Sequence, residues 1–228
     1  MKKLDILYED NHIIAVNKSC SDIVQGDKTG DEPLSDKVKA YIKKKYDKPG
    51  DVFLGVVHRL DRPVSGVVMF ARTSKALSRL NKMFQEKQVK KTYWAVVNKM
   101  PPHEEGELRH YILKNSEKNK SYAFPKERPG SKLAILNYKL VSGLLKYYLL
   151  EIDLQTGRHH QIRCQLAKIG CSIRGDLKYG FPRSNEDGGI SLHSRRVEFI
   201  HPIKKEKVVI VANPPSTENL WREFTNVM

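Results

Sequence analysis

One short stretch of the chain places a carboxylate among arginines, between two apolar segments. Residues 58–66 read HRLDRPVSG, so Asp61 has Arg59 and Arg62 near it and is followed by Pro63, which fixes a turn. A carboxylate in such a place could act as a nucleophile or as a general base. The same residues could also form a salt-bridged turn at the edge of a sheet. This stretch alone leaves both interpretations open.

A second stretch combines aromatic rings with cations. Residues 90–97 read KKTYWAVV, so Tyr93 and Trp94 follow two lysines directly. A ring beside cations can stack on a base of a nucleic acid, although both rings are also common in ordinary strands. Neighbouring side chains of a strand point to opposite faces, so we expect only one of the two rings to meet a ligand.

A third stretch predicts a tight turn followed by a helix. Residues 154–166 read LQTGRHHQIRCQL, and the helix should begin near His159. A helix N-terminus preceded by Arg158 suits a phosphate group, and Arg163, one turn further on, could pair with a carboxylate. His159 and His160 are adjacent and have no partner at i+4, so we expect no metal site.

The charge of the chain favours a polyanionic partner. Its 228 residues include 41 Lys and Arg against 26 Asp and Glu, a formal net charge of +15. Nucleic acid and anionic membrane surfaces attract such a protein. No apolar run approaches the ~20 residues that span a bilayer, and the first residues lack the features of a signal peptide. We therefore predict a cytoplasmic protein whose partner is a nucleic acid rather than a membrane.

Several classes of enzyme are disfavoured by motifs that the chain lacks. The sequence contains no G-x-x-x-x-G-K-[ST], G-x-G-x-x-G, H-E-x-x-H or G-x-S-x-G motif. Its cysteines form no C-x-x-C pair, which favours reduced thiols without structural zinc. Any catalysis should therefore rest on side chains alone.

The pattern of apolar residues predicts an α+β fold, because most of the strands are joined by hairpins rather than by helical crossovers. No stretch has the composition of a linker, so we expect a single domain over residues 1–228. The polar segment 101–131 should be rich in loops, with a short strand or two. The hairpin within 132–154 should turn at Ser142 and Gly143. Buried strands are expected within 4–18, 52–57, 67–71, 90–99 and 190–211, and helices within 34–46, 73–89, 159–170 and 216–227.

Four motifs, taken together and in this order, resemble the RluA-type pseudouridine synthases, which isomerise uridine in structured RNA. The family carries H-R-L-D-x-x-T/V-S-G, K-x-Y-x-A-x-V, T-G-R-x-H-Q-I/L-R and G-D-x-x-Y-G. The chain reads HRLDRPVSG, KKTYWAVV, TGRHHQIR and GDLKYG. Two departures are a Ser19 and Ser21 where the family usually has Pro and Gly, and Val64 where Thr is common. The resemblance begins too early in the chain for the S4-like module of many relatives, so we expect a catalytic domain without one.

The resemblance implies a mixed, largely antiparallel central sheet with flanking helices, and it implies roles for particular residues. Asp61 matches the catalytic aspartate, which acts near C1′ of the uridine. Tyr93 matches the tyrosine that stacks on the uracil and is a candidate for proton transfer, and Arg163 matches the arginine that pairs with the aspartate. For contacts to the RNA or the uridine we expect Arg59, Arg62, Lys91, Arg158, His160, Gln161, Ile162 and Leu192.

The chemistry agrees with these roles. Breaking the C1′–N1 bond and bonding the base again through C5 needs neither a cofactor nor a metal. It needs a carboxylate at the sugar, a platform for the detached base and exclusion of water. A buried carboxylate tends to take up a proton, and a paired Arg163 would keep Asp61 ionised.

We therefore predict a monomeric RNA pseudouridine synthase that acts on specific uridines of ribosomal or transfer RNA. The alternative is a non-catalytic basic RNA-binding protein in which Asp61 only bridges its arginines. A basic nuclease ranks last, because it would need a metal cluster or an acid–base pair of histidines.

Overall fold

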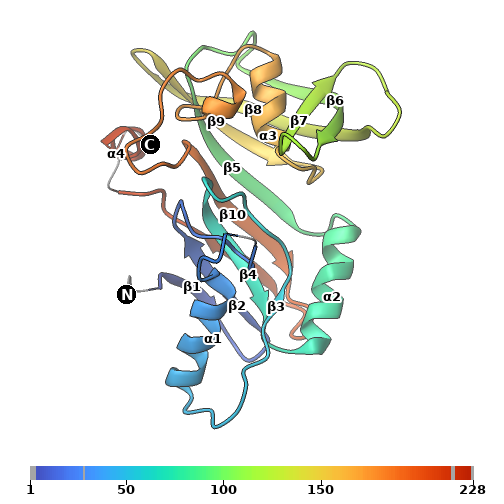
Figure 1. Cartoon of the computed structure of the whole chain (residues 1–228), viewed down its shortest axis with the longest axis vertical. Helices are drawn as coiled ribbons and strands as arrows, with labels where there is room; N and C mark the ends of the chain where they lie inside the picture. Colours follow the sequence, from blue (N-terminus) through green and yellow to red (C-terminus); the bar gives the residue numbers. More distant parts are fainter. Residues whose placement is uncertain (1–3, 28, 217–218, 227–228) are drawn as a thin grey trace. The chain divides into compact units, whose positions relative to one another are not determined.

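The computed structural model describes residues 4–27, 29–216 and 219–226. It divides into two compact units, each of which contains strands and helices (Figure 1). The first unit comprises Met1–Val89 and Ser194–Pro214, and the second comprises Lys90–His193 and Pro215–Met228. The α+β class predicted from the sequence is confirmed. A single domain over residues 1–228 stays a prediction.

The first unit is built on neighbouring strands in the order β1-β2-β4-β10, with β3 paired to β4 and β11 paired to β10. The pairs β1–β2, β2–β4, β3–β4 and β10–β11 are antiparallel. The bounds are β1 (Ile6–Glu9), β2 (Ile13–Lys18), β3 (Gly55–Val56), β4 (Ser65–Ala71), β10 (Leu192–Ile200) and β11 (Lys207–Val211). The strands expected within 4–18 and 190–211 are confirmed, and each range forms a hairpin, β1–β2 and β10–β11.

Two helices of this unit form where the sequence predicts them. Helix α1 (Leu34–Lys45) buries Leu34, Val38 and Ile42, which recur at helical spacing. Helix α2 (Ser74–Gln85) lies against β3 and β4. Its N-cap is Thr73, whose hydroxyl oxygen accepts a hydrogen bond of 3.2 Å from the backbone N–H of Ala76.

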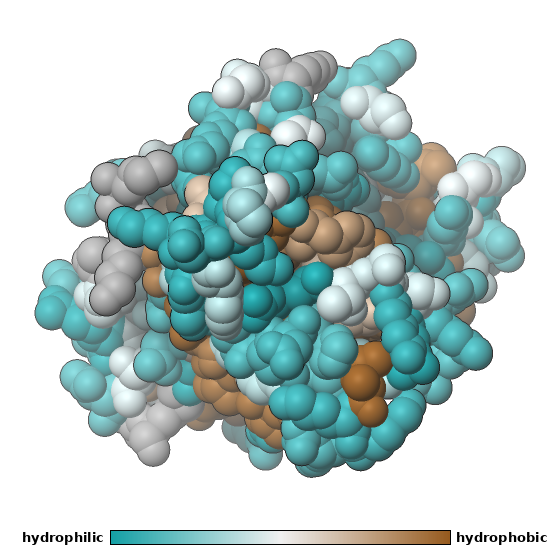
Figure 2. All heavy atoms as spheres, turned by 90° about the horizontal axis from the view of Figure 1, so that it is seen from below, coloured by the Kyte–Doolittle hydropathy of each residue, from teal (hydrophilic) through white to brown (hydrophobic). Residues whose placement is uncertain are grey.

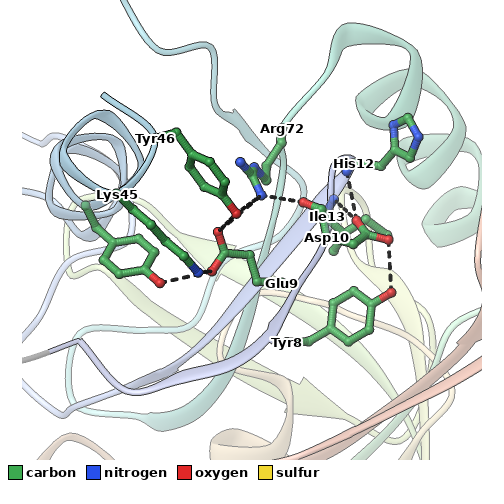
Figure 3. Close-up of polar contacts among 9 residues, drawn as sticks. Tyr8, Glu9, Asp10, His12, Ile13, Lys45, Tyr46 and Arg72 are labelled. Carbon is green, nitrogen blue, oxygen red and sulfur yellow. Dashed lines mark hydrogen bonds and ion pairs between the residues drawn. The ribbon is translucent and has the colours of Figure 1, made fainter. Parts of the chain in front are cut away.

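The carboxylates of Glu9 and Asp10, at the turn between β1 and β2, bind different partners (Figure 3). Glu9 reaches helix α1, where it accepts hydrogen bonds from Tyr41 (3.0 Å), Lys45 (2.6 Å) and Tyr46 (2.8 Å). Asp10 accepts hydrogen bonds within the turn from the backbone N–H groups of His12 and Ile13. The Glu9 contacts explain why the end of α1 is fixed although its last turn consists of exposed lysines.

The prediction of a buried strand over residues 52–57 is wrong. Only Gly55 and Val56 form a strand, and the side chain of Phe53 is 48% exposed. Strand β3 pairs only with the last two residues of β4, so the run VFLGVV touches the sheet at its edge. Apolar composition alone does not distinguish such an edge from a core strand.

The second unit has the strand order β5-β9-β8-β6-β7, and all four of these pairs are antiparallel. Helix α3 lies against β6 and β7, and α4 contributes Trp221 and Phe224 to a core cluster around Trp94 (Figure 1). The bounds are β5 (Lys90–Val97), β6 (Glu105–Asn115), β7 (Lys120–Phe124), β8 (Lys132–Leu144), β9 (Tyr147–Leu154), α3 (Gln161–Lys168), the 3-10 helix η1 (Leu177–Tyr179) and α4 (Asn219–Asn226).

Two details of this unit differ from the sequence-based expectation. The turn of the β8–β9 hairpin lies at Leu145 and Lys146, whereas Ser142 and Gly143 are inside the strand next to an irregular register. Gly143 is required there by close packing, because a Cβ would lie 3.2 Å from the ring of Tyr148. The segment expected to be rich in loops contains β6, one of the long strands of the unit.

The surface agrees with the charged composition. Hydrophilic residues cover most of the face shown in Figure 2, and hydrophobic residues form smaller patches between them. Within the described part of the chain, no helix has both the length and the apolar character needed to cross a membrane.

Replacing Asp10 by Asn should lower the free energy of unfolding by about 1–2 kcal/mol at pH 7. Burial alone would raise the pKa of Asp10, but hydrogen bonds from the backbone N–H groups of His12 and Ile13 and from Lys204 and Tyr8 outweigh it and lower the pKa to about 2. Since the pKa in the folded state lies below the ordinary 3.8, this stabilisation is present above pH 3.8 and is lost as the pH falls toward 2.

Urea unfolding at pH 7 and at pH 3 measures the difference in free energy of unfolding between the wild type and the Asn variant. This difference should be smaller at pH 3. Asp51→Asn is a matched control, because Asp51 is exposed. A difference between wild type and Asp10→Asn that does not depend on pH would contradict the assignment of the effect to the charge.

Candidate active site

Asp61 lies in the loop that joins β3 to β4, in the first unit. Its backbone carbonyl accepts a hydrogen bond of 3.0 Å from the N–H of Val64, which closes a tight turn across Arg62 and Pro63. Leu60 and Val64 are buried on either side of this turn. The Asp61 side chain is half-buried at the place where the loop is anchored.

The buried ammonium group of Lys18 fastens this loop to the end of β2. Lys18 is 1% exposed, and its Nζ donates to the carbonyl oxygens of Ser19 (2.9 Å), Arg62 (3.0 Å) and Val64 (2.7 Å). Burial lowers the pKa of Lys18 to about 8, against the opposing attraction of Asp22, Cys20 and Asp61. An ammonium has three N–H donors, which match the three carbonyls. The sequence analysis did not single out Lys18.

Two further contacts fix the same loop. Gly66 has a φ of 112°, and a Cβ there would lie 2.3 Å from the backbone oxygen of Ser194 in β10. His58 accepts a hydrogen bond at Nε2 from the N–H of Met69 (3.1 Å), and its ring stacks on Phe84 at 5.1 Å between centroids. Both ends of the HRLDRPVSG motif are therefore tied to strand backbone.

The two arginines beside Asp61 are exposed. The guanidinium of Arg62 forms an ion pair with Asp31 of the preceding loop. Contacts of Arg59 and Arg62 to RNA stay a prediction, and Arg62 also ties its loop to the loop before α1 through Asp31.

Tyr93 and Trp94 lie on β5, in the second unit. Trp94 packs in the core with Trp221 and Phe224, and its indole N–H donates to Glu151 (3.3 Å). Tyr93 is 7% exposed and, as the neighbouring strand residue, points to the other face. Trp94 is thus a core residue, which leaves Tyr93 as the ring that could meet a base.

The TGRHHQIR segment folds back on itself at the start of α3. The side-chain oxygen of Gln161 accepts hydrogen bonds from the hydroxyl of Thr156 (2.8 Å) and the N–H of Arg158 (3.0 Å), and its amide donates to the carbonyl of Ile135 (3.1 Å). The predicted helix begins two residues later than expected, because His160 adopts a left-handed φ of 53° as the N-cap.

Two other predicted residues, Arg158 and Lys91, lie at this turn. Arg158 is exposed, and its Nε donates to the carbonyl of Leu133 (3.0 Å). The Nζ of Lys91 lies 3.8 Å from the position that a Cβ on Gly157 would take, and burial lowers the pKa of Lys91. Ile162 and Leu192 are buried, at 5% and 3% exposure.

Arg163 forms a buried ion pair with Asp176. Its Nε and Nη2 donate to the two carboxylate oxygens of Asp176 at 2.7 Å and 2.8 Å. The ring of Tyr179 lies 5.1 Å from the guanidinium carbon, and its hydroxyl lies 2.9 Å from Nδ1 of His160. Asp176 and Tyr179 belong to the GDLKYG motif, which the sequence analysis noted without assigning roles to its residues.

The structure thus brings the predicted residues together in two groups. Arg59, Asp61 and Arg62 share one loop of the first unit. In the second unit, Arg163 and His160 both contact Tyr179, while Lys91, Arg158 and Gln161 surround the turn before α3. Among the residues that the structure describes, no three His, Cys, Asp or Glu side chains gather as metal ligands.

The family model described as RNA pseudouridylate synthase matches residues 12–168. The chain belongs to the RNA pseudouridine synthase family. An uncharacterized RNA pseudouridine synthase of Bacillus subtilis is 33% identical over 97% of this chain and 72% of its own length. Ribosomal large subunit pseudouridine synthase C of Buchnera aphidicola is 33% identical over 91% of this chain and 66% of its own length. The resemblance to RluA-type enzymes is therefore confirmed, and the enzymes of this family are isomerases.

The fold is shared with solved structures. Human RNA pseudouridylate synthase domain containing 4 superposes with a TM-score of 0.78 at 23% identity, over 93% of this chain and 89% of that chain. The predicted fold class, a sheet with flanking helices of the pseudouridine synthase type, is confirmed.

Replacing Ser21 by Gly should raise the free energy of unfolding by about 0.5–1 kcal/mol. Ser21 has a φ of 71°, which disfavours any residue with a Cβ, and its N–H donates to the carbonyl of Arg62 (3.0 Å) in the Asp61 loop. This is the position where the resembling family usually has Gly. Thermal and urea unfolding measure the effect. Gly at the exposed Ser116 should not stabilise, and an equal gain there would contradict the explanation.

Replacing Lys18 by Met should lower the free energy of unfolding by about 2–4 kcal/mol, because three carbonyl groups, that of Val64 in a buried bond, lose their donor. Urea unfolding measures the loss. Lys37→Met is a matched control, since the ion pair between Lys37 and Asp22 is partly exposed and should contribute less than about 1 kcal/mol. An unchanged midpoint for Lys18→Met would show that the loop is held by other contacts.

Proposed function

We propose that this chain converts specific uridines of structured RNA to pseudouridine, with Asp61 as the catalytic carboxylate. Family membership carries the proposal, together with the position of Asp61. The HRLD motif of the family lies at residues 58–61. The loop that contains it is fixed by His58 at its start and by Lys18 and Gly66 after Asp61. A salt-bridged surface turn would not need a buried ammonium group to hold its backbone.

Two side chains of the second unit complete the proposed chemistry. Tyr93 would stack on the uracil while the base is detached from C1′, and it is the candidate for proton transfer. Arg163 would pair with the Asp61 carboxylate and keep it ionised. The buried surroundings of Arg163 support this role, because a guanidinium donates its strongest hydrogen bonds where water is excluded.

The remaining predicted residues would bind RNA around a nucleotide turned out of its helix. Arg59 and Arg158 are exposed and suit phosphate groups. For Gln161, the three intramolecular hydrogen bonds favour shaping the turn that presents Arg158. His160, Ile162, Lys91, Arg62 and Leu192 would line the same site or support it.

The RNA partner is proposed to be ribosomal or transfer RNA in the cytoplasm, bound by a monomer whose two units form one catalytic domain. The net charge of +15 supports a polyanionic substrate. Similar proteins are named ribosomal large subunit pseudouridine synthases C and D, which makes ribosomal RNA the first fraction to test. The chain spans between 66% and 72% of the length of these relatives and of the Bacillus protein.

Replacing Asp61 by Asn should abolish pseudouridine formation, a loss of at least about 1,000-fold, because the amide cannot act as a nucleophile or a base. Binding of RNA should change less than about threefold, since phosphate contacts dominate affinity. Ribosomal and transfer RNA fractions from cells that lack the gene are incubated with each purified protein, and pseudouridine is mapped by carbodiimide labelling.

Asp51→Asn is the control, because it removes one exposed carboxylate from the loop that precedes β3. An active Asp61→Asn variant would remove Asp61 from the chemistry. Wild-type protein that binds RNA and forms no pseudouridine in either fraction would instead favour a non-catalytic RNA-binding protein.

A further inference from the structure

Lysine side chains gather along and just after helix α1, and only some of them have a carboxylate partner. Three of them form ion pairs: Lys37 with Asp22 (2.8 Å), Lys39 with Asp36 (3.7 Å) and Lys45 with Glu9 (2.6 Å). Lys43 and Lys44, in the last turn, and Lys48, just beyond it, are exposed and form no ion pair with any residue that the structure describes. The ammonium groups of these three residues, which we call the α1 lysine cluster, are available to an anionic partner.

The backbone that carries the α1 lysine cluster is fixed. The N–H of Lys48 donates to the carbonyl of Lys43 (3.1 Å), so the chain folds back onto the last turn of the helix. The Glu9 carboxylate, whose side chain is 9% exposed, accepts hydrogen bonds from Lys45 and from the hydroxyl of Tyr46 (Figure 3). The lysines of the cluster therefore extend from a fixed support within residues 43–48.

Nearby carboxylates do not cancel the charge of the cluster. Glu9 is already balanced by two cations, since its Oε1 lies 3.2 Å from Nη1 of Arg72 and its Oε2 lies 2.6 Å from Nζ of Lys45. Residues 43–48 contain four lysines and one carboxylate, that of the exposed Asp47. The end of α1 is therefore a positively charged surface, which attracts a polyanion.

The other end of α1 is connected to the loop that contains Asp61. The N–H of Leu34 donates to the carbonyl of Ile23 (2.7 Å), and the N–H of Ser21 in the same segment donates to the carbonyl of Arg62 (3.0 Å). Helix α1 has 12 residues and is therefore about 18 Å long. The α1 lysine cluster thus lies one helix length from this connection, within reach of RNA that is bound at the Asp61 loop.

The negative end of the helix dipole offers another explanation for lysines at this place. It accounts for Lys43 and Lys44, because they lie in the last turn and the effect falls off within one turn. Lys48 follows the C-cap residue Tyr46 and lies outside the helix. Stabilisation of the helix therefore does not explain Lys48, whereas binding of an anion explains all three lysines.

We propose that the α1 lysine cluster binds phosphate groups of the RNA segment next to the uridine that the enzyme modifies. Each ammonium group that neutralises a phosphate releases condensed counterions, so the contacts add affinity that weakens as salt is added. The cluster contributes binding and takes no part in bond breaking. This inference rests on the proposed function, which supplies RNA as the partner.

A variant that carries Lys43→Gln, Lys44→Gln and Lys48→Gln tests the inference. Filter binding measures its affinity for ribosomal RNA from cells that lack the gene, over a series of salt concentrations. The slope of the logarithm of the binding constant against the logarithm of salt concentration should become shallower by about 2–3, because each lost phosphate contact removes about 0.7–0.9. The single-turnover rate constant at saturating protein should stay within about twofold. An unchanged slope overturns the inference.

A second triple variant, with Lys75→Gln, Lys82→Gln and Lys87→Gln, is the matched control. These lysines lie on or just after helix α2 of the same unit and are exposed, so replacing them removes the same formal charge. Lys82 already pairs with Glu86 (3.7 Å). The salt slope of the control should change by less than about one. An equal change in both variants overturns the inference, because RNA affinity would then follow net charge rather than the α1 lysine cluster.

Asp47→Asn provides a test with the opposite sign. Asp47 has a φ of 45°, a conformation that asparagine also adopts readily, so the backbone should not change. Removing the carboxylate within residues 43–48 should strengthen binding of the same RNA about two- to threefold at low salt, where charges are screened least. Damage to the fold would weaken binding instead, so an unchanged or lower affinity overturns the inference.

Failure of this inference and failure of the proposed function give different results. If the α1 triple variant keeps the wild-type slope while the wild type forms pseudouridine, the inference fails and the proposed function holds. If the α1 triple variant shows the shallower slope while the wild type forms no pseudouridine, the proposed function fails and RNA binding by the α1 lysine cluster holds.

Discussion

A buried ammonium group sets the conformation of the loop that contains Asp61. Lys18 donates to the carbonyl oxygens of Arg62 and Val64, which follow Asp61, and to that of Ser19 after β2. The loop therefore cannot shift without leaving the buried ammonium group without its acceptors. Such a contact stabilises one geometry more than it stabilises the fold as a whole. The proposed role of Asp61, which requires one position of its carboxylate, would benefit from that restriction.

The second unit also holds a buried cation, but there the partner is a carboxylate rather than a set of carbonyl groups. Arg163 is buried with a carboxylate partner, and the pair is placed on a short helix, a left-handed glycine and a tyrosine that bonds to a neighbouring strand. In both units the charged group of a long cationic side chain is bound to oxygen acceptors inside the protein. Lysine suits three separate carbonyls as a compact charge, and arginine suits one flat carboxylate.

Much of the fold could be predicted from local patterns. Val38 and Ile42 identify α1 by their spacing, and Thr73 identifies the start of α2 by its capping hydroxyl. The run VFLGVV misled the prediction because apolar composition does not reveal whether a strand has partners on both sides. The turn at Leu145 was also missed, since Gly143 suggested a turn and instead serves close packing against Tyr148.

The site was predictable where residues are adjacent in the chain and less so where they meet through the fold. The motif around Asp61 and the helix that contains Arg163 are visible in the sequence. Arg62 and Val64, whose carbonyl groups bind Lys18, lie 44 and 46 positions after it. Asp176 lies 13 positions after Arg163. No periodicity links such pairs, so only the three-dimensional structure assigns them.

The close approach of Gly66 to Ser194 makes the backbone of β10 a spacer for the loop that contains Asp61. Because backbone meets backbone there, with room for a hydrogen atom and not for a carbon, the distance between β4 and β10 is fixed by peptide geometry rather than by side-chain packing. Side chains in the surrounding core can therefore change in size over evolution without altering where the loop begins. The position of the loop is inherited with the sheet, and specificity for particular RNAs can vary around it.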